Sequence, residues 1–219
     1  MTLIKWLLDY VSTKLNAILT YKKSDMVLAV HSDASYLSKA EARSRVGGHF
    51  FYSQESEDPI DNGAVLNISK ILKAVMSSAA EAELGTLYIN AREAIPMRQL
   101  LTEMGHKQPK TIMITDNSTA FGAVNNNIQP RRTKAMDMCF HWLQDRIQQC
   151  QFRAQHVAGN QNVSDYFTKA LPRCKHDQYA MPHTAYVILS MIPLHHLYYT
   201  FASYTILYVS YILLFYFVN

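Results

Sequence analysis

Short apolar runs separated by polar turns dominate the part of the chain that precedes position 75. Met26–Val30 reads MVLAV and stops at a polar His-Ser-Asp triplet, a pattern typical of a strand. Two more strands are predicted, at HFFYS after Gly48 and at AVLNIS after Gly63. Because parallel neighbours need long crossovers and these connections are short, we expect an antiparallel meander of three strands.

Helical spacing replaces this pattern from position 77 onward. Apolar residues recur three and four positions apart, which predicts a helix over Ser77–Met104. One of its two opening serines can cap the helix, with Glu81 supplying the carboxylate of a capping box. Pro96 should kink or interrupt the helix, and Gly105 should end it.

The remaining segments alternate between strand and helix patterns. We expect a strand at 111–115, a short helix at 117–125, an amphipathic helix at 131–150, a strand at 151–157 and a short helix at 163–171. A meander followed by alternating elements predicts an α/β fold, in which a five-stranded mixed sheet carries helices on both faces.

Charge divides the chain into two parts. Charged residues make up 17 % of the sequence, and every Lys, Arg, Asp and Glu lies at or before Asp177. The net charge of +4 is mild and does not by itself indicate a nucleic-acid partner. We therefore predict a helical connecting segment at 1–24, a folded domain at 25–177 and an uncharged apolar tail at 178–219.

The tail and the cysteines bear on location. The uncharged stretch 197–218 is long enough to span a bilayer, but tyrosines run through its whole length and tyrosine prefers membrane interfaces. It is therefore either a transmembrane anchor or translated read-through. We expect no secretory signal at the N-terminus, and the three cysteines lack disulfide or zinc spacing. We expect a cytoplasmic protein, or a membrane protein if the tail is an anchor.

Four acidic residues occupy positions suited to binding metal ions. Asp33 and Asp116 follow apolar strands, Glu83 lies on the apolar side of the long helix, and Asp165 begins the last helix. Clustered carboxylates repel one another until divalent cations bind between them, and oxygen-only ligands favour Mg²⁺ or Mn²⁺. Each acid alone also fits a structural role, in a turn, at a helix start or at a half-exposed position. Their order on strand, helix, strand and helix is more specific.

Several motifs together point to one family. Over residues 10 to about 187 the chain resembles the ribonuclease H domain that ends the polyprotein of copia-type LTR retrotransposons. The chain departs from the family at Ser35, where a second acid is common, and at Ala135, where a histidine is common. The matching motifs are HSDASY at 31–36, RVGG at 45–48, SSAAEAEL at 77–84, TDNS at 115–118, RTK at 132–134 with Asp137, and NVSDYFTK at 162–169.

The resemblance implies a ribonuclease H-like fold and two-metal hydrolysis of the RNA strand of RNA–DNA hybrids. By position, the four acids match the family's catalytic metal ligands, which would hold two Mg²⁺ or Mn²⁺ ions. Glu81 is the competing candidate for the helix acid. Residues 7–22 resemble the segment that leads in from a reverse transcriptase, so the chain looks like a fragment of an element whose product resides in a virus-like particle. No obligate oligomer is expected.

Other functional assignments have structural alternatives. His156 is either a proton shuttle or an exposed histidine at a strand end. The basic residues Arg131, Arg132 and Lys134 sit at a helix start, where they bind phosphate or simply face solvent. Asn117 and Ser118 open a helix whose backbone amides can bind phosphate. The alternative function is a catalytically silent retroelement relic or a nucleic-acid-binding module. In either case the C-terminal tail would tether the protein to a membrane if it is an anchor.

Overall fold

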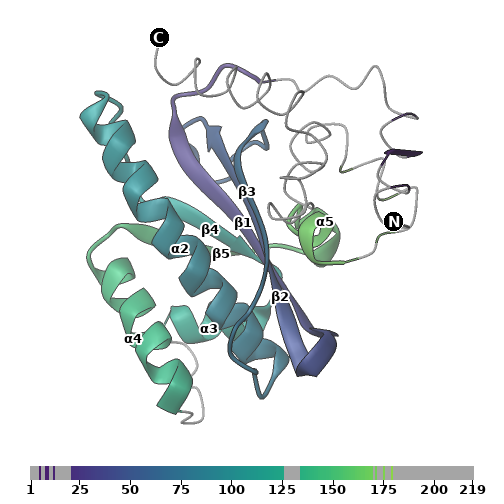
Figure 1. Ribbon diagram of the computed structural model, residues 1–219. Coiled ribbons are helices and arrows are strands. Elements are labelled where there is room, and N and C mark those ends of the chain that lie inside the picture. The colour runs from purple at the N-terminus through teal and green to yellow at the C-terminus, as the bar shows by residue number, and fades with distance from the viewer. Residues whose placement is uncertain are drawn as a thin grey trace.

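The computed structural model describes residues 21–125 and 134–169, together with the single positions 5, 8, 9, 12, 171, 175 and 179. In this part of the chain five strands form one sheet in the order β3-β2-β1-β4-β5 (Figure 1). The strands are β1 (Val27–Lys39), β2 (Arg43–Ser53), β3 (Ala64–Ile71), β4 (Thr111–Thr115) and β5 (Phe152–His156). The helices are α2 (Ala79–Glu103), α3 (Ser118–Val124), α4 (Lys134–Gln148) and α5 (Asp165–Thr168), with 3₁₀ turns η1 (Ala40–Ala42) and η2 (Gly159–Gln161).

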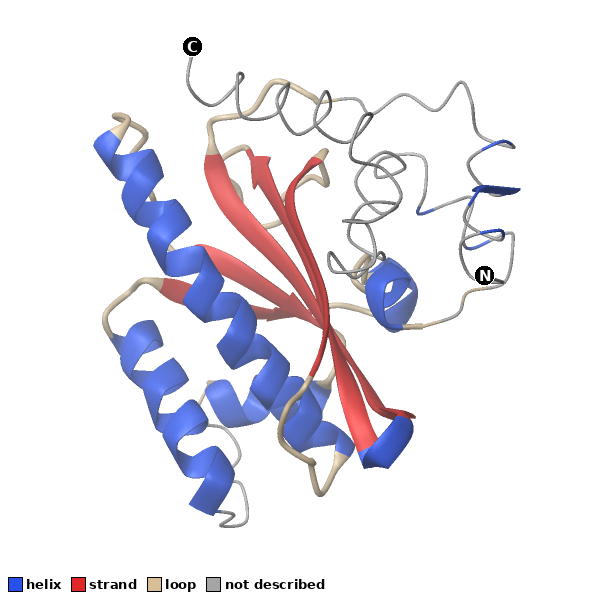
Figure 2. Cartoon of the chain, viewed as in Figure 1, coloured by secondary structure: helices blue, strands red, loops and turns tan. Residues whose placement is uncertain are grey.

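The sheet is mixed, as the sequence predicts. β1, β2 and β3 form an antiparallel meander, and β4 runs parallel to both β1 and β5. α2, α3 and α4 cover one face of the sheet, while α5 packs against β1, β2 and β3 on the other (Figure 2). The predicted fold class, a five-stranded mixed sheet with helices on both faces, is confirmed.

Alternation along β1 decides which side chains meet which helix layer. Leu28 and Val30 join the main core under α2 and α4, whereas Ala29 packs with Phe51 on the opposite face. Successive strand residues point to opposite faces, so His31 and Asp33 follow Ala29 toward the side of α5. The stacking of the His31 ring on Phe51, at 5.5 Å between ring centroids, agrees with this placement.

The first strand is longer than predicted, and its extension creates an opening in the sheet. β1 pairs with β4 only over Ala29–His31, but its pairing with β2 continues as far as Ser35. Beyond His31, β1 therefore stays with β2 and leaves the end of β4. The prediction that the strand ends near Val30 is wrong, because the polar triplet that follows is buried and hydrogen-bonded into the sheet.

The long helix α2 begins where the capping-box pattern indicates. The Ser78 hydroxyl accepts a hydrogen bond from the Glu81 amide at 3.2 Å, and Glu81 Oε2 accepts one from the Ser77 amide at 2.9 Å. The predicted interruption at Pro96 is wrong, since α2 continues through it. Pro96 lies on the exposed side of the helix, where water can reach the carbonyl that lacks an amide partner.

Parts of the predicted organisation lie outside the described residues. These are most of the connecting segment 1–24, the amphipathic helix before Lys134 and nearly all of the tail 178–219. Among the residues that the structure does describe, none belongs to a helix with the length and apolar character needed to cross a membrane.

Candidate metal centre

Three of the four predicted acids converge at the opening between β1 and β4. Asp33 lies on β1, Asp116 directly follows β4, and Asp165 is the first residue of α5. One carboxylate oxygen from each residue lies within 4.8 Å of the others. The separation of β1 from the end of β4 makes room for this cluster, at the carboxyl edge where parallel strands commonly place a ligand.

Asp33 is the most deeply buried member of the cluster, with 1 % of its surface exposed. Its Oδ2 accepts a hydrogen bond from the Thr168 hydroxyl, and its Oδ1 lies 3.3 Å from the ammonium of Lys169. Burial raises the pKa of Asp33 to about 6, against the opposing effects of Lys169 and Thr168. The protein therefore holds a carboxylate where its charge is costly.

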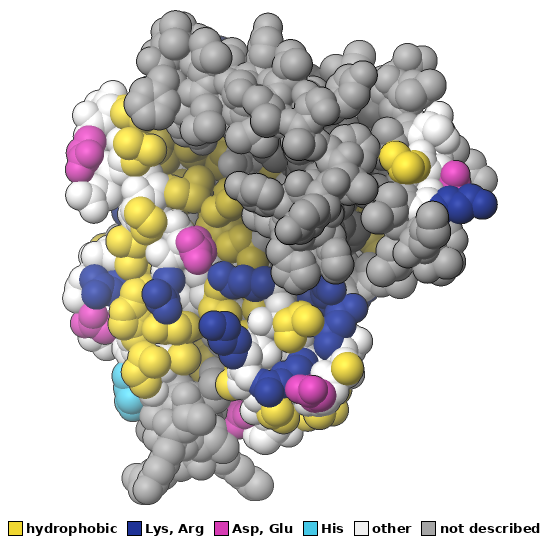
Figure 3. Space-filling model, viewed as in Figure 1, with side chains coloured by type: hydrophobic (Ala, Val, Ile, Leu, Met, Phe, Trp, Pro, Cys, Tyr) yellow, Lys and Arg dark blue, Asp and Glu magenta, His cyan; other side chains and the backbone are white. Residues whose placement is uncertain are grey.

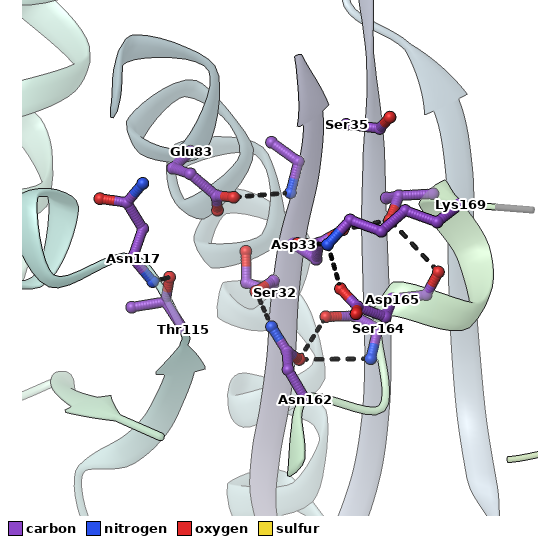
Figure 4. A network of polar contacts seen from close by, with 12 residues as sticks. Ser32, Asp33, Ser35, Glu83, Thr115, Asn117, Asn162, Ser164, Asp165 and Lys169 are labelled. Atoms are coloured by element: carbon purple, nitrogen blue, oxygen red, sulfur yellow. Dashed lines mark hydrogen bonds and ion pairs between the residues drawn. The ribbon is translucent and has the colours of Figure 1, made fainter. Parts of the chain in front are cut away.

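Lys169 also contacts a second acid of the cluster. Its Nζ donates to Asp165 Oδ1 at 2.5 Å, one helical turn away along the chain. Figure 4 shows the lysine side chain lying across Asp33 and Asp165. Although burial lowers it, the pKa of Lys169 is raised overall by these two carboxylates. Thr168 and Lys169 belong to the NVSDYFTK motif at 162–169, but sequence reasoning gave neither residue a role in the cluster.

Glu83 stands beside the cluster but is not part of the group of three. It projects from α2, is 5 % exposed, and its Oε1 accepts a hydrogen bond from the Ala34 amide at 3.1 Å (Figure 4). Burial and then the charge of Asp33 raise its pKa well above the ordinary value. Glu81, the competing candidate, instead bonds the backbone at the start of α2.

A buried amide network fastens the loop that carries Asp165. Asn162 donates from Nδ2 to the Ser32 carbonyl at 2.9 Å, and its Oδ1 accepts from the Ser164 hydroxyl at 2.6 Å. On the other side of β1, Asn90 donates to Ser32 Oγ at 3.0 Å and to the Gly47 carbonyl at 2.9 Å. Sequence reasoning assigned no role to Asn90 and Asn162, because their contacts with β1 and β2 join residues far apart along the chain.

Gly47 lets α5 approach the sheet closely enough to complete the cluster. A Cβ atom at this position would lie 2.6 Å from Thr168 Cγ2 and 2.8 Å from the Ser164 carbonyl oxygen. Both distances are shorter than van der Waals contact, so any larger residue must displace α5 or β2. Gly47 pairs with Asp33 across β1 and β2, which puts this close contact next to the buried acid.

The predicted accessory residues lie at varied distances from the cluster. The exposed His156 donates from Nε2 to the Asp116 carbonyl at 3.1 Å, so its ring borders the site. The Asn117 side chain caps α3 by accepting from the Ala120 amide at 2.9 Å, and Ser118 is the exposed first residue of that helix. The other predicted nucleic-acid contacts, Arg131, Arg132 and the side chain of Lys134, lie outside the described residues.

Metal-free protein should show a pH signature of the buried acid. The folded state raises the pKa of Asp33 from 3.8 to about 6, so it binds that proton more tightly than the unfolded chain does. Its contribution to the free energy of unfolding should therefore fall, by on the order of 2 kcal/mol, as pH rises from about 4 to about 6. Urea unfolding in EDTA across this range measures the slope, and Asp33→Asn should flatten it. Parallel curves for the two proteins would contradict this expectation.

Comparisons with known proteins agree with the motifs. No protein-family model matches the chain. Its sequence is similar to the retrovirus-related Pol polyprotein from transposon TNT 1-94 of Nicotiana tabacum, with 27 % identity over 172 residues, or 78 % of this chain. It is also similar to that from transposon RE1 of Arabidopsis thaliana, with 24 % identity over 179 residues, or 81 % of this chain. The chain spans 12 % of the length of each polyprotein. These relatives confirm the resemblance to transposon polyproteins.

Solved structures that resemble the chain include ribonuclease H domains. One is the N-terminal domain of a Mycobacterium tuberculosis protein, at a TM-score of 0.46 and 10 % identity, covering 71 % of this chain and 96 % of that one. Another is LC11-RNase H1 in complex with an RNA/DNA hybrid, at a TM-score of 0.46 and 9 % identity, covering 64 % of this chain and 93 % of that one.

Proposed function

We propose that this chain is a retrotransposon-derived ribonuclease H that hydrolyses the RNA strand of RNA–DNA hybrids. The observation that carries the proposal is the convergence of Asp33, Asp116 and Asp165, from three separate elements, to within 4.8 Å. Its relatives in sequence are retrovirus-related Pol polyproteins of transposons, which supports the retroelement origin. An acidic centre at the carboxyl edge of a mixed sheet suits metal-assisted phosphodiester hydrolysis.

The donor set fits divalent metal ions. The three aspartates offer only oxygen ligands, which suit Mg²⁺ or Mn²⁺ better than zinc. Among the described residues, Glu83 Oε2 is buried and has no hydrogen-bond partner, so a further ligand oxygen is available beside the cluster. Two such ions would activate a water molecule and stabilise the leaving oxygen. We assign Asp33, Glu83, Asp116 and Asp165 as their ligands.

Residues around the acids would orient them and handle protons. Thr168 holds Oδ2 of Asp33, and Asn162 ties the loop before Asp165 to β1. Because these supports are themselves buried, the carboxylates need little reorganisation when charge develops on the phosphate. His156 is exposed and bonded to the Asp116 carbonyl, which puts a group able to exchange protons at the rim of the site.

A basic surface lies beyond the acids along the β1–β2 hairpin. Arg45 pairs with Ser35, two positions past the Asp33–Gly47 pair, and Lys39 and Arg43 follow at the end of the hairpin. Figure 3 shows Lys and Arg side chains gathered on this side of the molecule. Lysine and arginine on such a surface bind nucleic acid mainly through the phosphates, with little sequence preference. We propose that this surface contacts the hybrid together with Asn117, Ser118, Arg131, Arg132 and Lys134.

Cleavage of a labelled hybrid by the full-length chain tests the proposal. We expect Mg²⁺-dependent cutting of the RNA strand, no cutting of the DNA strand or of single-stranded RNA, and complete loss of activity in EDTA. Binding of the hybrid without cleavage by folded protein with Mg²⁺ present would contradict the enzyme and favour a nucleic-acid-binding module. Folding can be checked by circular dichroism on the same sample.

Two glutamates on one helix provide a matched pair for the site assignment. Glu83→Gln should lower the cleavage rate by about a hundredfold, because it removes a charge beside the cluster. Glu81→Gln should leave the rate within about twofold and cost about 0.5–1 kcal/mol of stability, because it weakens only the cap of α2. Single-turnover kinetics and urea unfolding of both variants measure these effects. The reverse pattern would assign the helix acid to Glu81.

A further inference from the structure

Lys169 is placed as a cation inside the acidic centre. Its Nζ lies 2.5 Å from Asp165 Oδ1 and 3.3 Å from Asp33 Oδ1. The two carboxylates come from different elements, and their side chains are 11 % and 1 % exposed, whereas that of Lys169 is 41 % exposed. A partly solvated ammonium therefore connects two buried acids that would otherwise repel each other.

We propose that Lys169 is a built-in counter-ion of this centre, which holds Asp33 and Asp165 together without metal and is displaced when a divalent cation binds. This inference rests on the proposed function only in taking these acids to be the metal ligands. The ammonium and the metal ion compete for the same two carboxylates. The lysine therefore raises the metal concentration that is needed to occupy the centre.

The contacts of Asp33 make such an exchange possible without loss of the fold. Lys169 contacts Oδ1, while the Thr168 hydroxyl bonds Oδ2. When the ammonium leaves, the second contact still orients the carboxylate. The four-carbon stem of lysine is flexible and its head is readily solvated, so Lys169 can move into water by rotating its side chain. Asp165 remains fixed by its backbone, which donates to the Asn162 carbonyl at 3.2 Å.

Metal binding by Lys169→Met tests the inference without depending on catalysis. Methionine keeps much of the side-chain length and removes the charge. The matched control is Lys70→Met, because Lys70 also contacts a carboxylate, Glu93 at 3.4 Å, but on an exposed surface. Mn²⁺ affinity of the full-length chain can be followed by electron paramagnetic resonance of the free ion. Thermal unfolding with and without Mg²⁺ is the second measurement.

We expect Lys169→Met to bind Mn²⁺ about tenfold more tightly than the wild type, since a neighbouring positive charge has been removed. In EDTA this variant should also unfold at a lower temperature than the wild type. Added Mg²⁺ should raise its unfolding temperature by more than it raises that of the wild type. Lys70→Met and the charge-preserving Lys169→Arg should stay within about twofold of the wild-type affinity.

Unchanged or weaker Mn²⁺ binding by Lys169→Met would overturn the inference and leave the proposed nuclease standing if the wild type binds metal and cleaves. If Lys169→Met folds only when a divalent metal is present, the result supports the inference. Failure to fold both with and without metal would make Lys169 purely structural and would also overturn it. Absence of metal binding in every variant would reject the proposed function as well.

Discussion

Asp116→Asn is expected to lower the rate of hybrid cleavage by about 10³-fold, on the order of 4 kcal/mol of transition-state stabilisation. The exchange keeps the size of the side chain and removes the negative charge that a metal ion requires. Asp116 is suited to this test because it is only half-buried, at the end of β4, where a neutral amide can be solvated. Single-turnover cleavage of a labelled hybrid at saturating Mg²⁺ measures the loss.

Stability separates this loss from simple unfolding. In EDTA the Asp116→Asn variant should be as stable as the wild type or more stable, because repulsion with Asp33 is relieved. Asp145→Asn on α4 is the matched control, since that carboxylate is exposed and its contacts, with Arg146 and Gln149, are local to the helix end. The control should retain full activity. If Asp116→Asn retains activity within threefold of the wild type, Asp116 is not one of the catalytic metal ligands.

The second large effect is expected from one methyl group at Gly47. Gly47→Ala puts a Cβ 2.6 Å from Thr168 Cγ2 and 2.8 Å from the Ser164 carbonyl, which forces α5 away from β2. We expect a stability loss of about 2 kcal/mol from this overpacking. Cleavage should fall by about a hundredfold, because Asp165 and Lys169 move with α5 and the acids no longer meet.

A compensating substitution makes the Gly47 test specific. Thr168→Ser removes the methyl group that clashes but keeps the hydroxyl that bonds Asp33. The double variant should therefore recover part of the lost stability and activity, whereas Thr168→Ser alone should have a small effect. Urea unfolding and cleavage rates of the four proteins form a double-mutant cycle. Strict additivity would show that Gly47 does not act through the methyl group of Thr168.

Local features of the fold were predictable, because short-range chemistry determines them. The strand at Thr111–Thr115 has three apolar residues between two β-branched threonines, and Ser78 with Glu81 has the spacing of a capping box. Pro96 was misjudged because sequence alone does not reveal that its side of α2 faces water. The extension of β1 past Val30 was missed because burial of the polar residues that follow depends on distant partners.

Some features of the candidate site were also predictable from the sequence, and others were not. The order of Asp33, Glu83, Asp116 and Asp165 along the chain indicated the acids, and the structure brings three of them together with the fourth beside them. The contact of Lys169 with two acids was not predictable, because it requires α5 to dock against β2. That docking depends on the absence of a side chain at Gly47, and neither the strand pattern nor the RVGG motif around this glycine reveals that α5 packs on it.

The distance along the chain between Asp33 and Lys169 has a consequence for biosynthesis. The two residues are 136 positions apart, yet their side chains meet in one cluster. During translation the N-terminal meander emerges from the ribosome long before α5 does, so a nascent chain can form most of its sheet without a complete acidic centre. Under the proposed function, such a nascent chain would lack the complete set of metal ligands until synthesis of the domain is almost finished. Truncation before Asp165 should therefore give a protein that retains the meander but lacks one of the three acids of the centre.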